Sequence, residues 1–390
     1  MIRNPFNYGR ELGAGQLVDR KAELAQVERT ICDGNKLFLI GPRRFGKTSI
    51  LKAAQDRLRE RNAIVLRFDA TASPTLETLV SRIVSHAAKA LDGEVKWVGE
   101  QLAHFFSMVR PDVKFSPADG EWSVQFGIER EKRENPMFFI DALDGFEKLA
   151  AAQPANRPVG LIIDEFQRVI ELGGEAIEYQ IRASIQQHSR VGYVFAGSKT
   201  RMLRDMVSNH SRPFYRLGDT TYIGAIPRED FAPFLREKFS EAGHNANEGV
   251  VTRILDLAQD VPYNVQALAS HCWYRLMDDG RPGGGGFTPE FVDETLNLVV
   301  RQQDPTYAGM WSQLTAIQQR TLLYVVAESG RGLTSANASR QVGHGASTIR
   351  QALVSMVNSE ILREDHTGRL IQYRFEDPFF DHWIRMTAME

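Results

Sequence analysis

The sequence predicts an α/β protein built on a parallel sheet, followed by a small helical unit and a further helical domain. Over residues 1–225, short apolar strands alternate with amphipathic helices, the order that produces βαβ units and a parallel sheet. Over residues 226–280, apolar side chains recur only with the helical period. The run RPGGGG at residues 281–286 cannot sustain regular structure, so a linker is expected there.

The strands of the expected sheet are short and apolar. They are predicted at residues 36–40, 63–69, 159–163, 191–196 and 220–223. The third and fourth are apolar enough to be buried on both faces, so they should be central strands. Helices are expected between the strands, including one whose first turn Ser73 would cap and one around residues 176–187.

Residues 92–158 interrupt this alternation and are expected to form an insertion that decorates the sheet domain. Within the insertion, residues 113–128 alternate in polarity and reverse near Asp119-Gly120, which predicts a β-hairpin. We expect Phe138 and Phe139 to be packing aromatics rather than platforms for stacked bases.

The domain boundaries follow from these patterns. The expected domains are a core at 1–225, a helical lid at 226–280, a linker with one helix at 281–305, and a last domain at 306–390. Helices are predicted at 229–242, 248–259, 264–277, 289–301, 311–327, 335–342 and 347–358. Two short strands should flank residues 365–368, and three helices followed by such a β-wing describe a winged helix-turn-helix.

Composition excludes several classes of protein. Hydrophobic residues make up 43% and charged residues 25%, which is typical of folded globular chains. The net charge of −2 gives no sequence-wide attraction to nucleic acid. No stretch reaches the roughly 18 apolar residues of a membrane span, and the first residues lack a signal-peptide pattern. We therefore expect a cytoplasmic protein, with Cys32 and Cys272 as small buried residues in a reducing compartment.

A glycine-rich motif follows the first strand. Its residues are Gly41, Pro42, Arg43, Arg44, Phe45, Gly46, Lys47 and Thr48, followed by Ser49, and they match G-x-x-x-x-G-K-[ST]. Such a loop turns successive backbone N–H groups toward phosphates, and the helix that starts there adds its positive dipole end. Lys47 would reach the β- and γ-phosphates and the Thr48 hydroxyl would ligate Mg²⁺. The alternative is an ordinary glycine turn.

A pair of carboxylates ends the buried strand at 159–163. Asp164 in this position would hold Mg²⁺, and Glu165 would orient and polarise the attacking water. Carboxylates also occur at helix starts for electrostatic reasons alone. With a phosphate loop upstream, hydrolysis of Mg-ATP is the favoured interpretation.

The next strand ends in Ala196-Gly197-Ser198. Ser198 would lie beside the γ-phosphate and sense it, the alternative being a helix cap. An arginine that stabilises transition-state charge could follow, and the candidates are Arg201, Arg204, Arg212 and Arg216, with the last two favoured. The alternative for each is a solvated surface position.

The combination of GPRRFGKTS, LIIDEFQ, FAGS, VPYNVQ and YRFEDPFFDHWI resembles the archaeal-ATPase family, in the AAA+/STAND division of P-loop ATPases. The resemblance implies a five-stranded parallel core with the two motif strands inside it, a helical lid and a C-terminal winged helix. It implies ATP and Mg²⁺ as cofactors and an adenine-contacting stretch at Val18-Asp19-Arg20. The lid start reads QDVPY where relatives carry glycines, and no clear second-sensor arginine follows Pro262.

The sequence leaves the partner open. Residues 306–390 carry eight arginines, no lysine and eight carboxylates, so their charge is balanced. The favoured hypothesis is an ATPase whose nucleotide state switches a protein partner or an assembly, including copies of itself. The alternative is a nucleotide-gated DNA-binding module that uses Arg350 and Arg369. A third is a scaffold that binds ATP without cleaving it, against which Glu165 argues.

Overall fold

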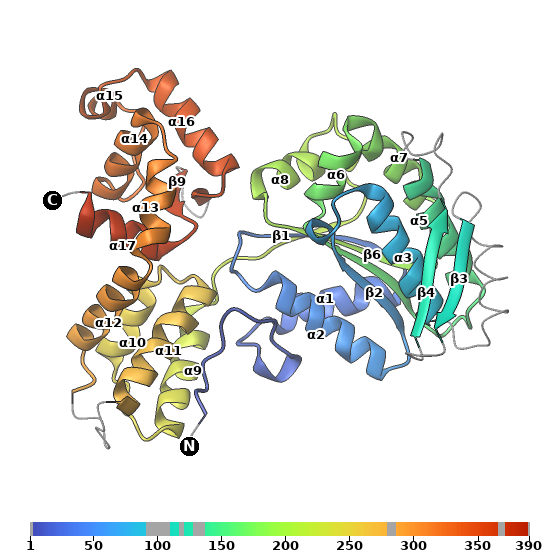
Figure 1. Ribbon diagram of the computed structural model, residues 1–390, viewed down its shortest axis with the longest axis horizontal. Coiled ribbons are helices and arrows are strands. Elements are labelled where there is room, and N and C mark those ends of the chain that lie inside the picture. The colour runs from blue at the N-terminus through green and yellow to red at the C-terminus, as the bar shows by residue number, and fades with distance from the viewer. Residues whose placement is uncertain are drawn as a thin grey trace. The chain divides into compact units, whose positions relative to one another are not determined.

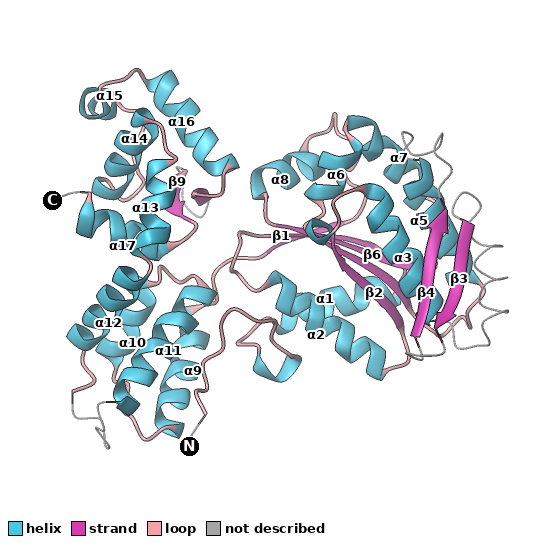
Figure 2. Cartoon of the chain, viewed as in Figure 1, coloured by secondary structure: helices cyan, strands magenta, loops and turns pink. Residues whose placement is uncertain are grey.

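The computed structural model describes residues 3–90, 110–116, 121–127, 137–278, 286–365 and 371–388. The chain divides into two compact units. The sheet unit comprises Leu12–Gly41 and Lys47–Ile223, and the helical unit comprises Met1–Glu11, Pro42–Gly46 and Gly224–Glu390. Figure 2 shows the described strands gathered in the sheet unit, apart from a short pair in the helical unit.

The sheet unit is built on a five-stranded parallel sheet in the order β2-β5-β6-β1-β7. Its strands are β1 (Lys36–Ile40), β2 (Ile64–Asp69), β5 (Val159–Asp164), β6 (Val191–Gly197) and β7 (Asp219–Tyr222). Each lies within one residue of its expected bounds. Every residue of β5 and β6 is buried, as their apolar sequences predicted. The two strands that precede the motifs, β1 and β5, each have a neighbour on both sides, with β6 between them.

Helices cover both faces of this sheet (Figure 1). One face carries α1 (Lys21–Cys32) and α2 (Lys47–Glu60); the other carries α3 (Leu76–Ala90), α5 (Met137–Ala151), α6 (Gln167–Gly173), α7 (Glu175–Ile185) and α8 (Thr200–Ser208). A Cβ on Gly192 would lie 2.4 Å from the Cα of Ile31. Glycine at this point of β6 therefore allows α1 to lie directly on the sheet.

The predicted hairpin is present. Strands β3 (Arg110–Ser116) and β4 (Glu121–Gly127) pair antiparallel with Val113 opposite Val124, and the expected turn at Asp119-Gly120 lies outside the described residues. Helix α5, however, falls inside the stretch that the sequence assigned to an insertion. Phe138, Phe139 and Phe146 are buried in the main core. The core therefore resumes at α5, because this segment is apolar enough to pack on the sheet.

The helical unit begins with α9 (Arg228–Glu241), α10 (Glu248–Leu257), α11 (Pro262–Asp278) and α12 (Pro289–Gln302). The link between α10 and α11 is the point where the sequence departs from its resemblance. Gln259 and Asp260 have φ angles of 48° and 56°, in the left-handed region that favours glycine. Gln259 donates to Asp381 at 2.9 Å and Asp260 pairs with Arg228 at 2.7 Å, so side-chain bonds hold this bend without glycine.

The last part of the helical unit has helices α13 (Asp304–Ser312), α14 (Ala316–Ala327), α15 (Ala336–Val342) and α16 (Ala346–Asn358), the antiparallel strands β8 (Leu362–Asp365) and β9 (Gln372–Phe375), and α17 (Pro378–Thr387). The prediction of a single helix at 311–327 is wrong, because α13 ends at Ser312 and α14 begins at Ala316. Thr315 and Gln318 form a reciprocal capping box that starts a new helix. Three helices and a strand pair follow in the expected order, and Phe379, Phe380 and Trp383 are buried as predicted.

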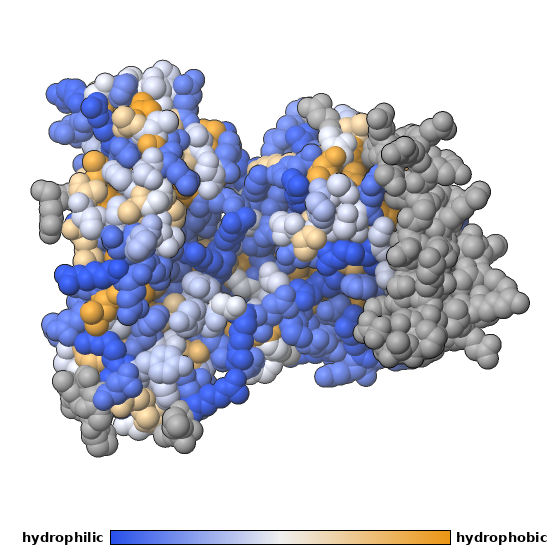
Figure 3. All heavy atoms as spheres, viewed as in Figure 1, coloured by the Kyte–Doolittle hydropathy of each residue, from blue (hydrophilic) through white to orange (hydrophobic). Residues whose placement is uncertain are grey.

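Surface properties agree with the composition. On the face shown in Figure 3, hydrophobic residues form small patches among hydrophilic ones. None of the helices in the described part of the chain is both long and apolar enough to span a bilayer. Cys272 is buried, which raises the pKa of its thiol to about 12. Cys32 is exposed, contrary to expectation, because it ends α1 on the side away from the sheet-facing residues.

Candidate functional site

The candidate site lies in the sheet unit, where neighbouring strands end. Gly41 follows β1, Asp164 closes β5, and Ser198 follows β6. Because β6 lies between β1 and β5 and all three are parallel, their carboxyl ends meet at one edge of the sheet. Ligands of open α/β sheets bind at this edge.

The two ends of the glycine-rich loop differ in how closely they are packed. A Cβ on Gly41 would lie 2.7 Å from Cβ of Ile223, so no larger residue fits where the loop leaves β1. Gly46 has a φ of 89° and nothing within 4 Å of an added Cβ, leaving open space beside the start of α2. The Nζ of Lys47 donates to the Gly41 carbonyl at 2.8 Å, which folds this buried side chain back over the loop.

Thr48 and Asp164 are brought together although 116 residues separate them. The Thr48 hydroxyl donates to Oδ2 of Asp164 at 2.8 Å, and the backbone N–H of Glu165 donates to Oδ1 at 3.0 Å. Burial raises the pKa of Asp164 above its ordinary value, although the charge of Lys47 opposes the shift. A buried carboxylate and a hydroxyl are oxygen ligands of the kind that Mg²⁺ prefers, so these residues fit the expected metal.

Glu165 and Ser198 form the next contact. The Ser198 hydroxyl donates to Oε2 of Glu165 at 2.7 Å, and its backbone N–H lies 3.3 Å from the same oxygen. The alternative role for Ser198 was that of a helix cap. Helix α8 begins at Thr200 without a side-chain cap, so Ser198 does not have this role. Glu165 has a φ of 52°, a left-handed conformation that is strained for a residue with a side chain and is common at functional sites.

The remaining loop residues belong to the helical unit and are engaged there. Arg43 pairs with Glu360 at 2.7 Å, and Arg44 pairs with Asp377 at 2.7 Å. Burial alone would lower the pKa of Arg44, but the charge and hydrogen bond of Asp377 outweigh it and raise the pKa. Phe45 is buried under the guanidinium of Arg363. Ser49, in the sheet unit, accepts a hydrogen bond from the backbone of Leu12 at 3.2 Å.

The favoured arginines are not joined to this cluster. Arg212 donates to Glu178 at 3.1 Å and also pairs with Asp205, while the exposed Arg216 lies over the ring of Tyr215. Arg204 lies over the ring of Tyr222. Across the described ranges, no hydrogen bond or ion pair links Arg212 or Arg216 to Lys47, Asp164 or Glu165.

Sequence reasoning missed Gln167. This buried side chain opens α6, and its amide Nε2 donates to Oε2 of Glu165. The residue stands in the motif LIIDEFQ, two positions after Glu165. Its polarity next to a buried strand was the available signal, but spacing alone does not show that the side chain turns back toward Glu165.

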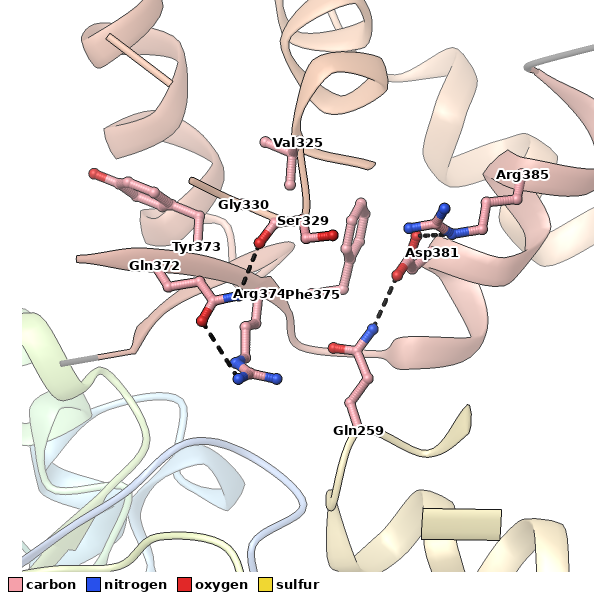
Figure 4. Close-up of a pocket in the computed structure, with 10 residues that line it drawn as sticks. All are labelled: Gln259, Val325, Ser329, Gly330, Gln372, Tyr373, Arg374, Phe375, Asp381 and Arg385. Atoms are coloured by element: carbon pink, nitrogen blue, oxygen red, sulfur yellow. Dashed lines mark hydrogen bonds and ion pairs between the residues drawn. The ribbon is translucent and has the colours of Figure 1, made fainter. Parts of the chain in front are cut away.

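A polar cavity of about 220 Å³ lies in the helical unit (Figure 4). Its polar side chains bond to one another or to backbone: Gln259 and Arg385 hold Asp381, and Gln372 donates to the Ser329 carbonyl at 2.8 Å. Ligand pockets are usually about 300–1,000 Å³ with a few polar groups aimed inward. This cavity is smaller, and its groups are engaged, so the sheet-edge site is the stronger candidate.

Comparison with known proteins establishes the fold. No family model and no curated protein matches the sequence. Among solved structures, the chain is similar to the Walker-type ATPase PABY2304 of Pyrococcus abyssi (TM-score 0.58, 15% identity, 98% of this chain and 99% of that one). It is also similar to the ORC2 protein of Aeropyrum pernix in its ADPNP-ADP complexes (TM-score 0.55, 14% identity, 100% and 99% coverage).

These similarities extend over nearly the whole chain. At 14–15% sequence identity they establish the fold alone. Together with the sheet order and the loop that follows β1, they define an α/β P-loop NTPase fold. The expected fold class is therefore confirmed.

Proposed function

We propose that the chain is a cytoplasmic ATPase of the archaeal-ATPase type that binds ATP with Mg²⁺, hydrolyses it, and uses its nucleotide state as a switch for a protein partner. The observation that carries the proposal is the contact between Thr48 and Asp164 beside Lys47 and the held carboxylate of Glu165. With Ser198, which holds Glu165, these residues come from three strand ends, and a turn of purely structural importance would not need to bring them together.

Each residue has a defined task in this proposal. Bound Mg-ATP would supply the electrophilic γ-phosphorus and a cation that offsets its charge. Thr48 and Asp164 provide the oxygen ligands, and Lys47 places a buried positive charge at the start of α2. Glu165 is partly exposed and accepts a hydrogen bond from water, orienting it for attack. Ser198 holds the other side of that carboxylate.

The decisive experiment compares Mg²⁺-dependent phosphate release from ATP by the wild type and by Glu165→Gln. We expect the variant to lose activity by at least about 100-fold while it still binds ATP, since only water activation is removed. Glu171→Gln is the matched control, because Glu171 lies on α6 and pairs with Lys199 and Arg168 outside the cluster. Full activity in Glu165→Gln would exclude this mechanism.

Two measurements test the switch: the mass of the particle and the set of proteins bound to it. Glu165→Gln should hold ATP uncleaved, so its mass and its bound proteins are compared in the ATP-loaded and ADP-loaded states. A nucleotide-dependent change in either supports a switch, and a copy of the same chain is one of the partners that this measurement detects. Identical results in both states would leave an ATPase without a switching role.

A second candidate function is nucleotide-gated DNA binding. The observation in its favour is that Arg340 on α15 and Arg350 on α16 are exposed. Arg363 and Arg374, in contrast, are engaged with Phe375 and Asp365, and Arg369 lies outside the described residues. Duplex DNA binding that weakens with salt and falls in Arg340→Ala/Arg350→Ala would support this function. Binding that is indifferent to both changes would exclude it.

A further inference from the structure

Three hydrogen-bond donors converge on one oxygen of Glu165. They are the hydroxyl of Ser198 at 2.7 Å, the backbone N–H of Ser198 at 3.3 Å, and the side-chain amide of Gln167. All three point to Oε2. No described residue donates a hydrogen bond to Oε1. One oxygen of this carboxylate is therefore anchored, and the other is available to a water molecule.

The second amide atom of Gln167 is also informative. Its Oε1 is buried and has no hydrogen-bond partner among the described residues. Leaving a buried acceptor unpaired is unfavourable, so this oxygen gives the fold no reason to hold an amide here instead of an apolar side chain of the same size. An unsatisfied buried group in a native structure calls for an explanation other than stability.

The neighbouring strand accommodates this amide. A Cβ on Gly197 would lie 2.2 Å from Oε1 of Gln167, so the amide occupies the space that any larger residue at the end of β6 would fill. Its Nε2 is 3.5 Å from the Ser198 hydroxyl, which places both side chains on the same carboxylate oxygen. Gly197 thus leaves room for the Gln167 amide, and Gln167 and Ser198 both contact the Glu165 carboxylate.

We propose that Gln167 is a positioning residue for ATP hydrolysis. With Ser198, it clamps Oε2 of Glu165, so that Oε1 is presented to the attacking water. The inference rests on the proposed function, since it assigns a task to a residue that acts through Glu165. A carboxylate held by one oxygen is pre-organised as a base, whereas a freely rotating one must be ordered in each turnover.

The test replaces Gln167 by methionine, which keeps the volume and removes the amide. We expect kcat to fall by about 10-fold to 100-fold with little change in KM or in ATP affinity, because orientation of the base matters only in the chemical step. The thermal midpoint should stay level or rise, since an unpaired buried oxygen is removed. A residue with a purely structural role would lower the midpoint and leave kcat per folded molecule unchanged.

The matched control is Gln180→Met. Gln180 lies on α7 and also carries an amide oxygen without a hydrogen-bond partner in the described ranges, but it donates no hydrogen bond to Glu165. We expect this variant to keep the wild-type kcat. If it loses as much activity as Gln167→Met, the loss reflects a general effect of removing an amide and the inference is wrong.

A double variant identifies the route of action. In the Glu165→Gln background, Gln167→Met should cause no further loss, because residues that act as a unit are not additive. An undiminished loss in that background, an unchanged kcat, or a raised kcat in the single variant would overturn the positioning role. A wild type without Mg²⁺-dependent hydrolysis would instead remove the proposed function, and this inference with it.

Discussion

Two polar clusters at opposite ends of β6 use the same kinds of group in different ways. The phosphate-end cluster consists of Lys47, Thr48, Asp164, Glu165 and Ser198; the amino-end cluster consists of Asp144, Ser184, His188 and Tyr193. Each combines carboxylate, hydroxyl and a basic group. Only the phosphate-end cluster lies where parallel strands end and a helix begins, the place where α/β sheets bind ligands.

The two aspartates show the difference in electrostatic terms. Hydrogen bonds from His188 and Ser184 lower the pKa of Asp144, outweighing the effect of burial. Burial raises the pKa of Asp164, because Lys47 and Thr48 do not compensate for it fully. The charge of Asp144 is therefore satisfied by the fold, whereas that of Asp164 is only partly satisfied. Carboxyl groups whose pKa is raised by burial cluster at functional sites, so the difference agrees with placing the candidate site at Asp164.

The amino-end cluster contains a serine, a histidine and an aspartate, yet it is not arranged as a catalytic triad. In a triad the imidazole uses one nitrogen for serine and the other for aspartate. Here Nε2 of His188 faces both, at 3.4 Å and 3.0 Å, while Nδ1 is 2.7 Å from the Tyr193 hydroxyl. The Ser184 hydroxyl donates to Asp144 directly. The geometry stabilises the fold and activates no nucleophile.

The largest expected effect comes from Lys47→Met. Removing the buried positive charge should lower ATP binding and hydrolysis by at least about 100-fold, since the phosphates lose a charge-assisted contact. Phosphate release and nucleotide affinity measure this effect. Lys52→Met, farther along α2 where the side chain pairs with Asp56, is the control and should retain activity. Equal losses in both variants would contradict the assignment of the site.

Tyr193→Phe tests the structural nature of the amino-end cluster. It removes the bond between a buried hydroxyl and His188, which should cost about 1 kcal/mol of stability. Thermal unfolding should report a drop, while kcat stays at the wild-type value. The exposed Tyr179 on α7 provides the control substitution Tyr179→Phe. A change in kcat without a change in thermal midpoint would assign this cluster a functional role instead.

Asp164→Asn should separate stability from activity. An acid whose pKa is raised on folding favours the folded state when protonated, so its ionised form weakens the fold above that pKa. At neutral pH the uncharged asparagine should therefore raise the nucleotide-free thermal midpoint by roughly 2 °C. Mg²⁺-dependent hydrolysis should be lost, because a ligand oxygen is removed. A lowered midpoint would show that the charge of Asp164 stabilises the fold.

The phosphate-end cluster was largely readable from the sequence, because its residues lie at or after the ends of short apolar strands. Thr48 follows β1 through the glycine-rich loop, Asp164 closes β5 and Ser198 follows β6, and parallel strands bring these ends together. Gln167 could not be assigned in this way. Its contact with Glu165 depends on how α6 turns back after β5, which no spacing rule reports.

The prediction of where α3 begins failed because side-chain hydrogen bonds determine the start of this helix. Ser73 was expected to cap α3. Instead, the Thr75 hydroxyl accepts a hydrogen bond from the backbone N–H of Thr78 at 3.2 Å, and the helix begins at Leu76. Ser73 instead accepts from Arg82 at 3.0 Å. Several residues in one stretch are suitable caps, and the choice among them is made by tertiary contacts.

The smallest expected effect is the pH dependence of Asp144→Asn. An acid whose pKa is lowered on folding contributes stability at neutral pH, and this contribution disappears as the pH falls through its folded pKa, which lies below the ordinary 3.8. Its side chain is 43% exposed, so the contribution should be less than about 1 kcal/mol.

The thermal midpoint of Asp144→Asn should therefore be lower than that of the wild type at pH 7, and the gap should close as the pH falls below the ordinary value of 3.8. The groups facing this carboxylate are Ser184, His188 and Lys148. Asp219→Asn, at the exposed start of β7, is the control. A gap that persists in acid would mean that the hydrogen bonds of Asp144, rather than its charge, distinguish the amino-end cluster from the phosphate-end cluster.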